Sequence, residues 1–155
     1  MKKVHFKNIL IGFAFSPNLK ANVFEATRLA NFFDGNLFFL HVGEKTVAKE
    51  KTFSEILKDS PVNPKQINVL WEEGQPDKTI IAQCKLHKID LLLLGALQRE
   101  NMVKFYLGSI ARKITRKAPC CVLLLIKPSV ERIPSQHMVV NAFESIQTET
   151  TIAAA

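Results

Sequence analysis

The chain has 155 residues, of which 47% are hydrophobic and 23% charged, and this is sufficient for one globular domain with its own core. The longest apolar run, residues 120–126, is far too short to span a bilayer, and the basic start is not followed by the apolar segment of a signal peptide. Because of the short apolar runs, we expect no membrane segment in this chain. The net charge is +7, and no aromatic residue interleaves with the basic pairs 112–113 and 116–117, so we expect no nucleic-acid partner.

Five apolar runs recur along the chain and predict five β-strands. Their starts fall 24 to 30 residues apart, which is the length of one strand–helix–strand unit. Most runs are continuous rather than alternating, as expected when helices cover both faces of a parallel sheet. The runs are Ile9–Phe15, Leu37–Val42, Ile67–Trp71, Leu91–Leu94 and Cys120–Ile126.

The segments between the first three runs predict two helices. The apolar spacing within Val23–Ala30 is typical of an amphipathic helix, which the pair Asp34–Gly35 is expected to end. A second, more charged helix is predicted over Lys45–Lys58, and the prolines of Pro61–Pro64 break it.

Two further helices are predicted before the fourth and fifth strands. The third begins in the segment Gly74–Asp77, because proline and aspartate suit a first helical turn, and its inward face is formed by residues 80, 81 and 84. The fourth runs over Ser109–Lys117 and stops before Pro119. Its basic pairs, 112–113 and 116–117, are interpreted as a solvated face near the helix C-terminus.

These elements make residues 1–128 one domain of the α/β class. Residues 129–155 are predicted to hold a linker and the truncated start of a second copy of the domain. With an offset of 128 residues, Ala142–Phe143 falls on Ala14–Phe15. The alternative is a C-terminal extension that docks on the domain or on a neighbouring subunit.

The most informative motif is an apolar strand that ends at Gly95, followed by a loop and by Gly108 and Ser109 at the start of a helix. A glycine at a strand exit lets the backbone pass close to a ligand, and a helix N-terminus offers free N–H groups and partial positive charge to an anion. The layout therefore predicts a cradle for phosphate. Gln98 stands where a second small residue would help; its side chain could obstruct the phosphates or donate its amide to them.

Other signatures of nucleotide binding and catalysis are absent from the sequence. There is no G-x-x-x-x-G-K-[ST] loop, no G-x-G-x-x-G after the first strand, and no G-x-S-x-G around Ser109. No pair of acidic residues follows the strands for general acid–base work. We therefore expect no catalytic residues and, as enzymatic activity, at most slow ATP hydrolysis.

The cysteines and histidines do not have the spacing of a metal site. Three cysteines, an odd number, predict buried thiols in a reducing compartment, the cytoplasm. Cys120 and Cys121 are neighbours on a predicted strand and should point to opposite faces. His41 ends a buried strand and is expected to be a core residue whose hydrogen bonds are satisfied.

Taken together, these segments resemble the universal stress protein family, of the UspA type, over about residues 6–127. Any one of the matching segments alone would be a weak signal, and their combination is specific. The residues that carry the resemblance are Asn8–Ser16, Leu40–Val42, Gly74 with Pro76, Ile89–Gly95, Leu107–Ala111 and Ala118–Leu125.

The resemblance implies a Rossmann-like, adenine nucleotide alpha hydrolase-like sandwich of three layers, with a five-stranded parallel sheet in the order 3-2-1-4-5. The ATP-binding members of the family carry the motif G-x2-G-x9-G-[ST]. In this chain Gly95, Gly108 and Ser109 match the motif, and Gln98 stands in place of the middle glycine. These members also have an acidic residue at the end of the first strand, which contacts the nucleoside; this chain has Ala14 at that position. Val42 matches the position whose backbone contacts the adenine. The nucleotide-binding residues implied are Phe13, Ala14, Val42, Gly95, Leu97, Gln98, Gly108, Ser109 and Ile110.

The resemblance also implies a regulatory domain of the stress response, with ATP or another adenine nucleotide as cofactor and Mg²⁺ as a candidate accompanying ion. Family members commonly form homodimers through the last strand, here Val122–Ile126. If the second copy is real, the chain would be the N-terminal domain of a tandem member instead. Because Ala14 and Gln98 depart from the family pattern, the alternative is a degenerate member that binds no nucleotide and acts through protein–protein contacts.

Overall fold

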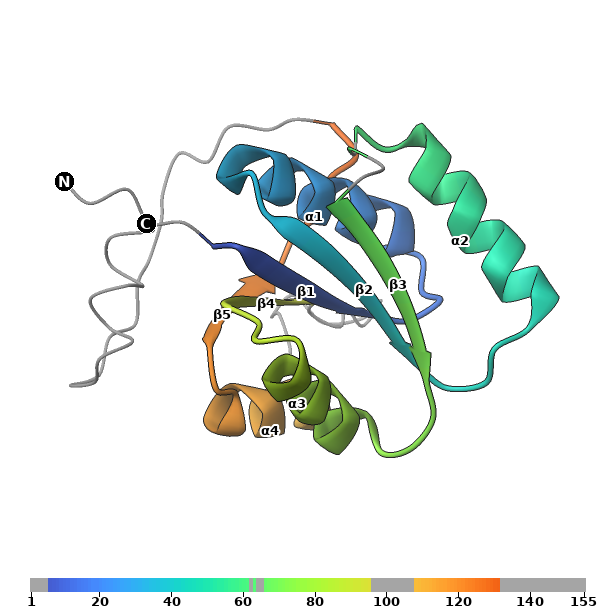
Figure 1. Cartoon of the computed structure of the whole chain (residues 1–155). Helices are drawn as coiled ribbons and strands as arrows, with labels where there is room; N and C mark the ends of the chain where they lie inside the picture. Colours follow the sequence, from blue (N-terminus) through green and yellow to red (C-terminus); the bar gives the residue numbers. More distant parts are fainter. Residues whose placement is uncertain (1–5, 62, 64–65, 96–107, 132–155) are drawn as a thin grey trace, which may run out of the picture.

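The computed structural model of the protein describes residues 6–61, 63, 66–95 and 108–131 (Figure 1). Strands and helices alternate along these residues, as the spacing of the apolar runs predicts. Of the predicted linker and start of a second copy, residues 129–155, the part from residue 132 onward lies outside the described residues. The elements are β1 (Asn8–Phe13), α1 (Leu19–Phe33), β2 (Asn36–Val42), α2 (Val47–Asp59), β3 (Ile67–Glu72), α3 (Pro76–Leu86), β4 (Leu91–Gly95), α4 (Ser109–Lys117) and β5 (Cys121–Leu125).

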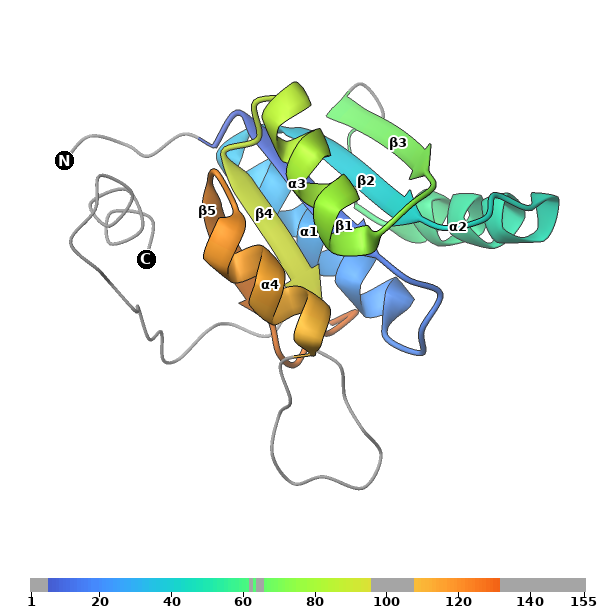
Figure 2. The same ribbon diagram turned by 90° about the horizontal axis from the view of Figure 1, so that it is seen from below.

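Five parallel strands form one sheet in the order β3-β2-β1-β4-β5. Helices α1 and α2 cover one face of the sheet and α3 and α4 cover the other, so the domain has three layers (Figure 1). The view from below shows α3 and α4 packed side by side (Figure 2). Both the strand order and the layered architecture confirm what the family resemblance implies.

The central strands are buried on both faces, which explains why their sequences are continuous apolar runs. In β1, Ile9 and Ile11 pack toward α1 and α2, whereas Leu10 between them packs toward α3 and α4. The sheet therefore separates two cores.

None of the three cysteines, which all lie in the described part of the chain, forms a disulfide. Cys120 and Cys121 belong to the cores on opposite faces of the sheet, as predicted. A hydrogen bond between the Cys84 and Cys120 thiols lowers the pKa of Cys84 and raises the pKa of Cys120. Cys120 is therefore held as the unreactive thiol at neutral pH.

The helix boundaries lie close to the predicted ones. Helix α2 begins at Val47 rather than Lys45, because Thr46 caps it by accepting a hydrogen bond from the backbone N–H of Lys49 at 3.2 Å. Helix α3 has its proline in the first turn, and of its three predicted inward residues only Ile81 is not fully buried. No helix in the described part of the chain has the length and hydropathy that a bilayer crossing requires.

The connection between α1 and β2 depends on close packing at Gly35. Asp34 itself takes the left-handed conformation that ends α1, with φ of 53°, a role more often filled by glycine. Gly35 is buried, and a Cβ atom there would lie 2.4 Å from the carbonyl oxygen of Phe6. The predicted helix stop at Asp34–Gly35 is thus confirmed, with the glycine making room for a neighbouring backbone.

Replacing Gly35 with alanine is expected to lower the free energy of unfolding by about 1–3 kcal/mol, because the backbone of Phe6 has to move. Urea denaturation of the wild type and the variant measures the loss. Gly12→Ala is the matched control, since the new Cβ would meet the terminal methyl of Ile80 at 3.1 Å, and a methyl can rotate away. Equal losses of stability in Gly35→Ala and Gly12→Ala would contradict the conclusion that Gly35 makes room for the backbone of Phe6.

Candidate functional site

The candidate site lies at the carboxyl edge of the sheet, between β1 and β4. These strands are adjacent and parallel, with Gly12 beside Leu94. The helix after β1 covers one face of the sheet, whereas the helix after β4 covers the other (Figure 1). In open α/β sheets, a crevice for ligands opens at such a switch point.

A cavity of about 290 Å³ occupies this position. It collects residues from the ends of β1, β2 and β4, from α3, and from the first turns of α1 and α4. Seven of the nine predicted site residues line it, while Leu97 and Gln98 lie outside the described residues. The seven are Phe13, Ala14, Val42, Gly95, Gly108, Ser109 and Ile110.

The start of α4 forms one wall of the cavity. Gly108 is the N-cap residue, and no side chain of the described residues caps the helix. The first turn also holds no acidic residue. The first intrahelical bond runs from the N–H of Arg112 to the carbonyl of Gly108 at 3.0 Å, so the earlier N–H groups are available to an anion.

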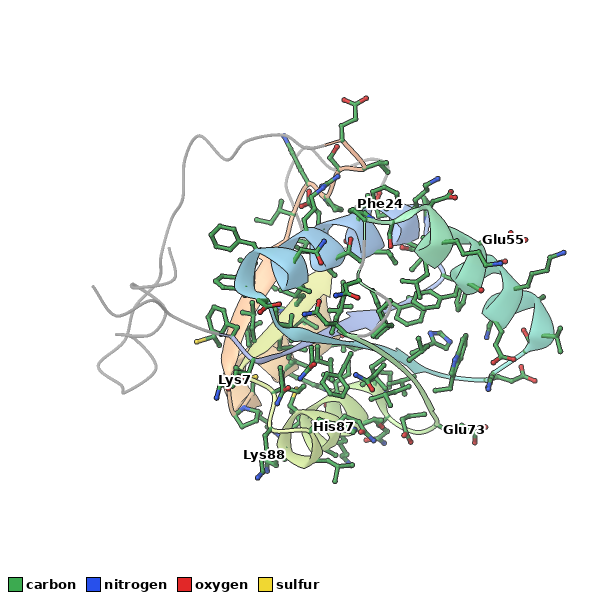
Figure 3. All side chains as sticks on the ribbon, turned by 45° about the horizontal axis from the view of Figure 1, so that its top comes forward. Lys7, Phe24, Glu55, Glu73, His87 and Lys88 are labelled. Atoms are coloured by element: carbon green, nitrogen blue, oxygen red, sulfur yellow. The ribbon has the colours of Figure 1, made fainter. Side chains whose placement is uncertain are left out.

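The charge of the cavity wall is low. Among the described residues that line it there is no aspartate, glutamate, lysine or arginine. An ion pair joins Lys113 of α4 to Asp77 of α3 at 3.9 Å. Asp77 directly follows the lining residue Pro76, and Lys113 directly precedes the lining residue Ile114. Figure 3 shows Lys7 and Lys88 gathered at another end of the molecule, away from Glu73, which follows β3 at the carboxyl edge.

Gly95 leaves space for a side chain that sequence reasoning missed. A Cβ atom at Gly95 would lie 2.8 Å from Nδ2 and 3.3 Å from Oδ1 of Asn22, which stands in the first part of α1 and also lines the cavity. The Oδ1 atom of Asn22 is buried and has no hydrogen-bond partner among the described residues. Gly95, which the sequence predicted to let the backbone pass close to a ligand, therefore also leaves room for the carboxamide of Asn22.

His41 differs in part from its prediction as a satisfied core residue. Its Nδ1 lies 3.1 Å from the carbonyl oxygen of Phe13 and donates to it, which leaves Nε2 as an acceptor. Nε2 is buried without a partner in the described part of the chain. The ring packs against Phe13, Phe15 and Trp71, so its position is rigid while half of its hydrogen-bonding capacity is unused.

The sequence contained a weak signal for Asn22 and none for the unpaired atom of His41. Asn22 immediately precedes Val23, a residue of the buried stripe of α1, so it borders the buried face of that helix. No cluster of three metal-ligating side chains occurs within the described ranges. As far as the described residues go, the lining thus offers apolar walls, a helix start without a side-chain cap and two buried acceptors without a partner.

Comparisons with known proteins agree with the fold. The model of the universal stress protein family matches residues 44–125. A universal stress protein of Methanocaldococcus jannaschii is 25% identical over 125 residues, which cover 68% of this chain and 74% of that protein. A solved universal stress protein in complex with cAMP is 18% identical, with a TM-score of 0.65, and the match covers 79% of this chain and 98% of that one. The universal stress protein from Archaeoglobus fulgidus in complex with dAMP is 16% identical, with a TM-score of 0.55 and coverage of 78% and 98%.

Proposed function

Because the chain belongs to the universal stress protein family, we propose that it is a regulatory domain that binds an adenine nucleotide in the cavity between β1 and β4. The observation that carries the proposal is the convergence of Gly95, Gly108 and Ser109 on one cavity at the uncapped start of α4. In this arrangement the N–H groups of α4 hold phosphate. The apolar side of the cavity, near Val42, receives the base.

Two similar structures support adenine nucleotides as the ligand class, since they are complexes with cAMP and dAMP. The domain is proposed to bind rather than transform its ligand, with slow ATP hydrolysis as the upper limit of its activity. Mg²⁺ would then accompany the phosphates of the ligand. Three cysteines that form no disulfide in the described part of the chain favour the cytoplasm as its compartment.

One observation favours a second candidate function, in which the domain binds no nucleotide and acts through protein contacts. Ala14 replaces the acid that family members use on the nucleoside, and the described lining holds no charged side chain to compensate. Losing a charged acceptor costs about 1.5–3 kcal/mol. That loss corresponds to roughly tenfold to a hundredfold in affinity.

Calorimetric titration with ATP, ADP and AMP separates the two candidates. Heat of binding that saturates below millimolar concentration for any of the three supports the nucleotide site. Absence of binding at millimolar nucleotide overturns it and leaves the protein-contact function. Phosphate release from ATP, followed over hours, measures the limit on hydrolysis.

We also propose that the domain forms a homodimer through β5. This strand lies at one edge of the sheet, and an unpaired edge strand is a template for pairing with another chain. Leu123 in β5 is 39% exposed and Ile126 just after it is 46% exposed. Pairing two copies of β5 would cover both side chains.

Light scattering over a range of protein concentrations is expected to give the mass of a dimer. Leu123→Lys should shift the mass toward the monomer, because a lysine in the pairing surface desolvates a charge. Leu86→Lys is the matched control, since Leu86 is 70% exposed at the end of α3, away from β5. A wild type that stays strictly monomeric refutes this assembly.

A further inference from the structure

The layer formed by α3 and α4 is strongly basic on its exposed side. These two helices hold six basic residues and a single acidic one, Asp77. The helices of the other layer, α1 and α2, hold five basic residues and four acidic ones. The positive charge of the described helices is therefore concentrated on one side of the sheet. We define the basic face by its exposed residues Lys78, Lys85, Lys88, Arg112, Lys113, Arg116 and Lys117.

The basic face is open to a partner. In the view of Figure 2, α3 and α4 lie in front of the sheet, and no element of the described chain covers them. Figure 3 shows Lys88 at one end of the molecule, whereas Glu55 of α2 lies on the opposite side. A large anionic surface can therefore approach the face without meeting another part of the described domain.

Helix stability does not explain this arrangement of charge. The partial negative charge of a helix C-terminus favours Arg116 and Lys117, but a helix N-terminus disfavours cations. Lys78 is nevertheless the third residue of α3, and Arg112 is the fourth residue of α4. Within α4, the cations of 112 and 116 and those of 113 and 117 stand four residues apart, a spacing at which like charges destabilise a helix. The cations therefore cost stability, which indicates a role outside the fold.

An apolar side chain stands among these cations. Leu86 lies next to Lys85 at the end of α3 and is 70% exposed. A bilayer with anionic lipids offers negative headgroups to the cations and acyl carbon to a leucine, while lysine and arginine stems lie along apolar surface with their charges in water. The phosphates of a nucleic acid offer no such surface. Neither α3 nor α4 has a Phe, Tyr or Trp on which the bases of a single strand would stack.

We infer that the basic face docks on the surface of a bilayer that contains anionic lipids. Clusters of four to eight basic residues on a helical surface are typical of such binding. The contact is peripheral, with the cations among the headgroups and Leu86 at their acyl boundary. Docking is independent of the proposed nucleotide site, because the cavity lies at the start of α4, whereas Leu86 and the pair 116–117 lie at the ends of the two helices.

Co-sedimentation of the whole chain with vesicles tests the docking. The vesicles consist of phosphatidylcholine alone or with about one third of phosphatidylglycerol, in about 50 mM salt. We expect binding to the anionic vesicles to be at least tenfold tighter than to the neutral ones, and to fall at least tenfold in about 300 mM salt, because salt screens the headgroup charges. No binding at low salt, or equal binding to both kinds of vesicle, overturns the inference.

A double variant tests whether the basic face makes the contact. Because each basic residue near an anionic bilayer contributes roughly fivefold to binding, Arg116→Gln together with Lys117→Gln is expected to weaken it roughly thirtyfold. Lys51→Gln together with Lys58→Gln is the matched control, since both residues are exposed on α2 and the net charge falls equally. The control should change vesicle binding less than about twofold. Equal losses in the two double variants would indicate a general attraction of a cationic protein and overturn the role of the face.

Leu86→Ser and a duplex competitor distinguish a lipid surface from a nucleic acid. Leu86→Ser is expected to weaken vesicle binding about fivefold, because the bilayer buries part of the leucine. Short duplex DNA, added at the same phosphate concentration as the anionic lipid, should leave the wild type on the vesicles. Unchanged binding in Leu86→Ser, or displacement of the wild type by the duplex, overturns the lipid surface as the partner. All variants are at exposed positions, so thermal unfolding should give Tm values close to that of the wild type.

Discussion

Gly108→Asp is expected to abolish nucleotide binding while the ligand-free domain keeps its fold. Gly108 is the N-cap of α4, with φ of −57° and ψ of 158°, a backbone conformation that any residue can adopt. Aspartate is a preferred N-cap residue, so the helix itself gains a cap. A carboxylate about 4 Å from a phosphate charge costs about 4 kcal/mol at the effective dielectric of a protein surface, or roughly a thousandfold in affinity.

Gly108→Asn is the matched control for this experiment. Asparagine has the size of aspartate and caps a helix as well, but it brings no charge. Titration of both variants with the best-bound nucleotide, together with thermal unfolding of each, separates the electrostatic effect from the steric one. An unchanged Kd in Gly108→Asp would count against the cavity as the binding site, and an equal loss in both variants would mean that Gly108 matters for space only.

Restoring an acid in Ala14→Asp is expected to strengthen adenine nucleotide binding by roughly tenfold to a hundredfold. Ala14 is exposed and lines the cavity directly after β1. A longer side chain at this position can therefore be accommodated. A carboxylate there would accept hydrogen bonds from donors of the nucleoside, which is the role implied for the acid of family members.

The size of the gain at position 14 also distinguishes the two proposed functions. Ala14→Asn, which supplies an acceptor without charge, should give a smaller gain than Ala14→Asp in the same calorimetric titration. Both variants should leave the Tm of the free protein close to that of the wild type, because the site is exposed. If neither variant binds nucleotide at millimolar concentration, the absence of an acid at position 14 is not the reason why the cavity fails to bind. That result would contradict the nucleotide-binding function.

The elements of the domain were readily predicted because they follow from local patterns. The continuous apolar runs of β1 and β4 reflect burial on both faces, and the proline of α3 and the helix over Ser109–Lys117 lie where they were expected. The small errors, such as the start of α2, come from a cap at Thr46 that apolar spacing does not reveal. The strand order came from the family resemblance rather than from the patterns themselves.

The candidate site was predicted only in part. Gly95 and Gly108 were marked by their spacing, and both line the cavity. The predicted contacts of Leu97 and Gln98 lie outside the described residues and stay predictions. Asn22 escaped notice because a single asparagine beside an apolar stripe is common on helices, and its meaning depends on Gly95, which is far away in the sequence.

The sequence by itself determined the alternation of strands and helices and marked Gly95 and Gly108 as candidates for a phosphate cradle. These are properties of residues close together in the chain, where periodicity and turn chemistry act. Only the tertiary structure decided that Asn22 and His41 keep buried atoms without partners among the described residues, that Gly35 makes room for the backbone of Phe6, and that the described cavity wall is uncharged. The reason is that hydrogen bonding, close approach and the charge of a cavity depend on atoms that folding brings together from different elements.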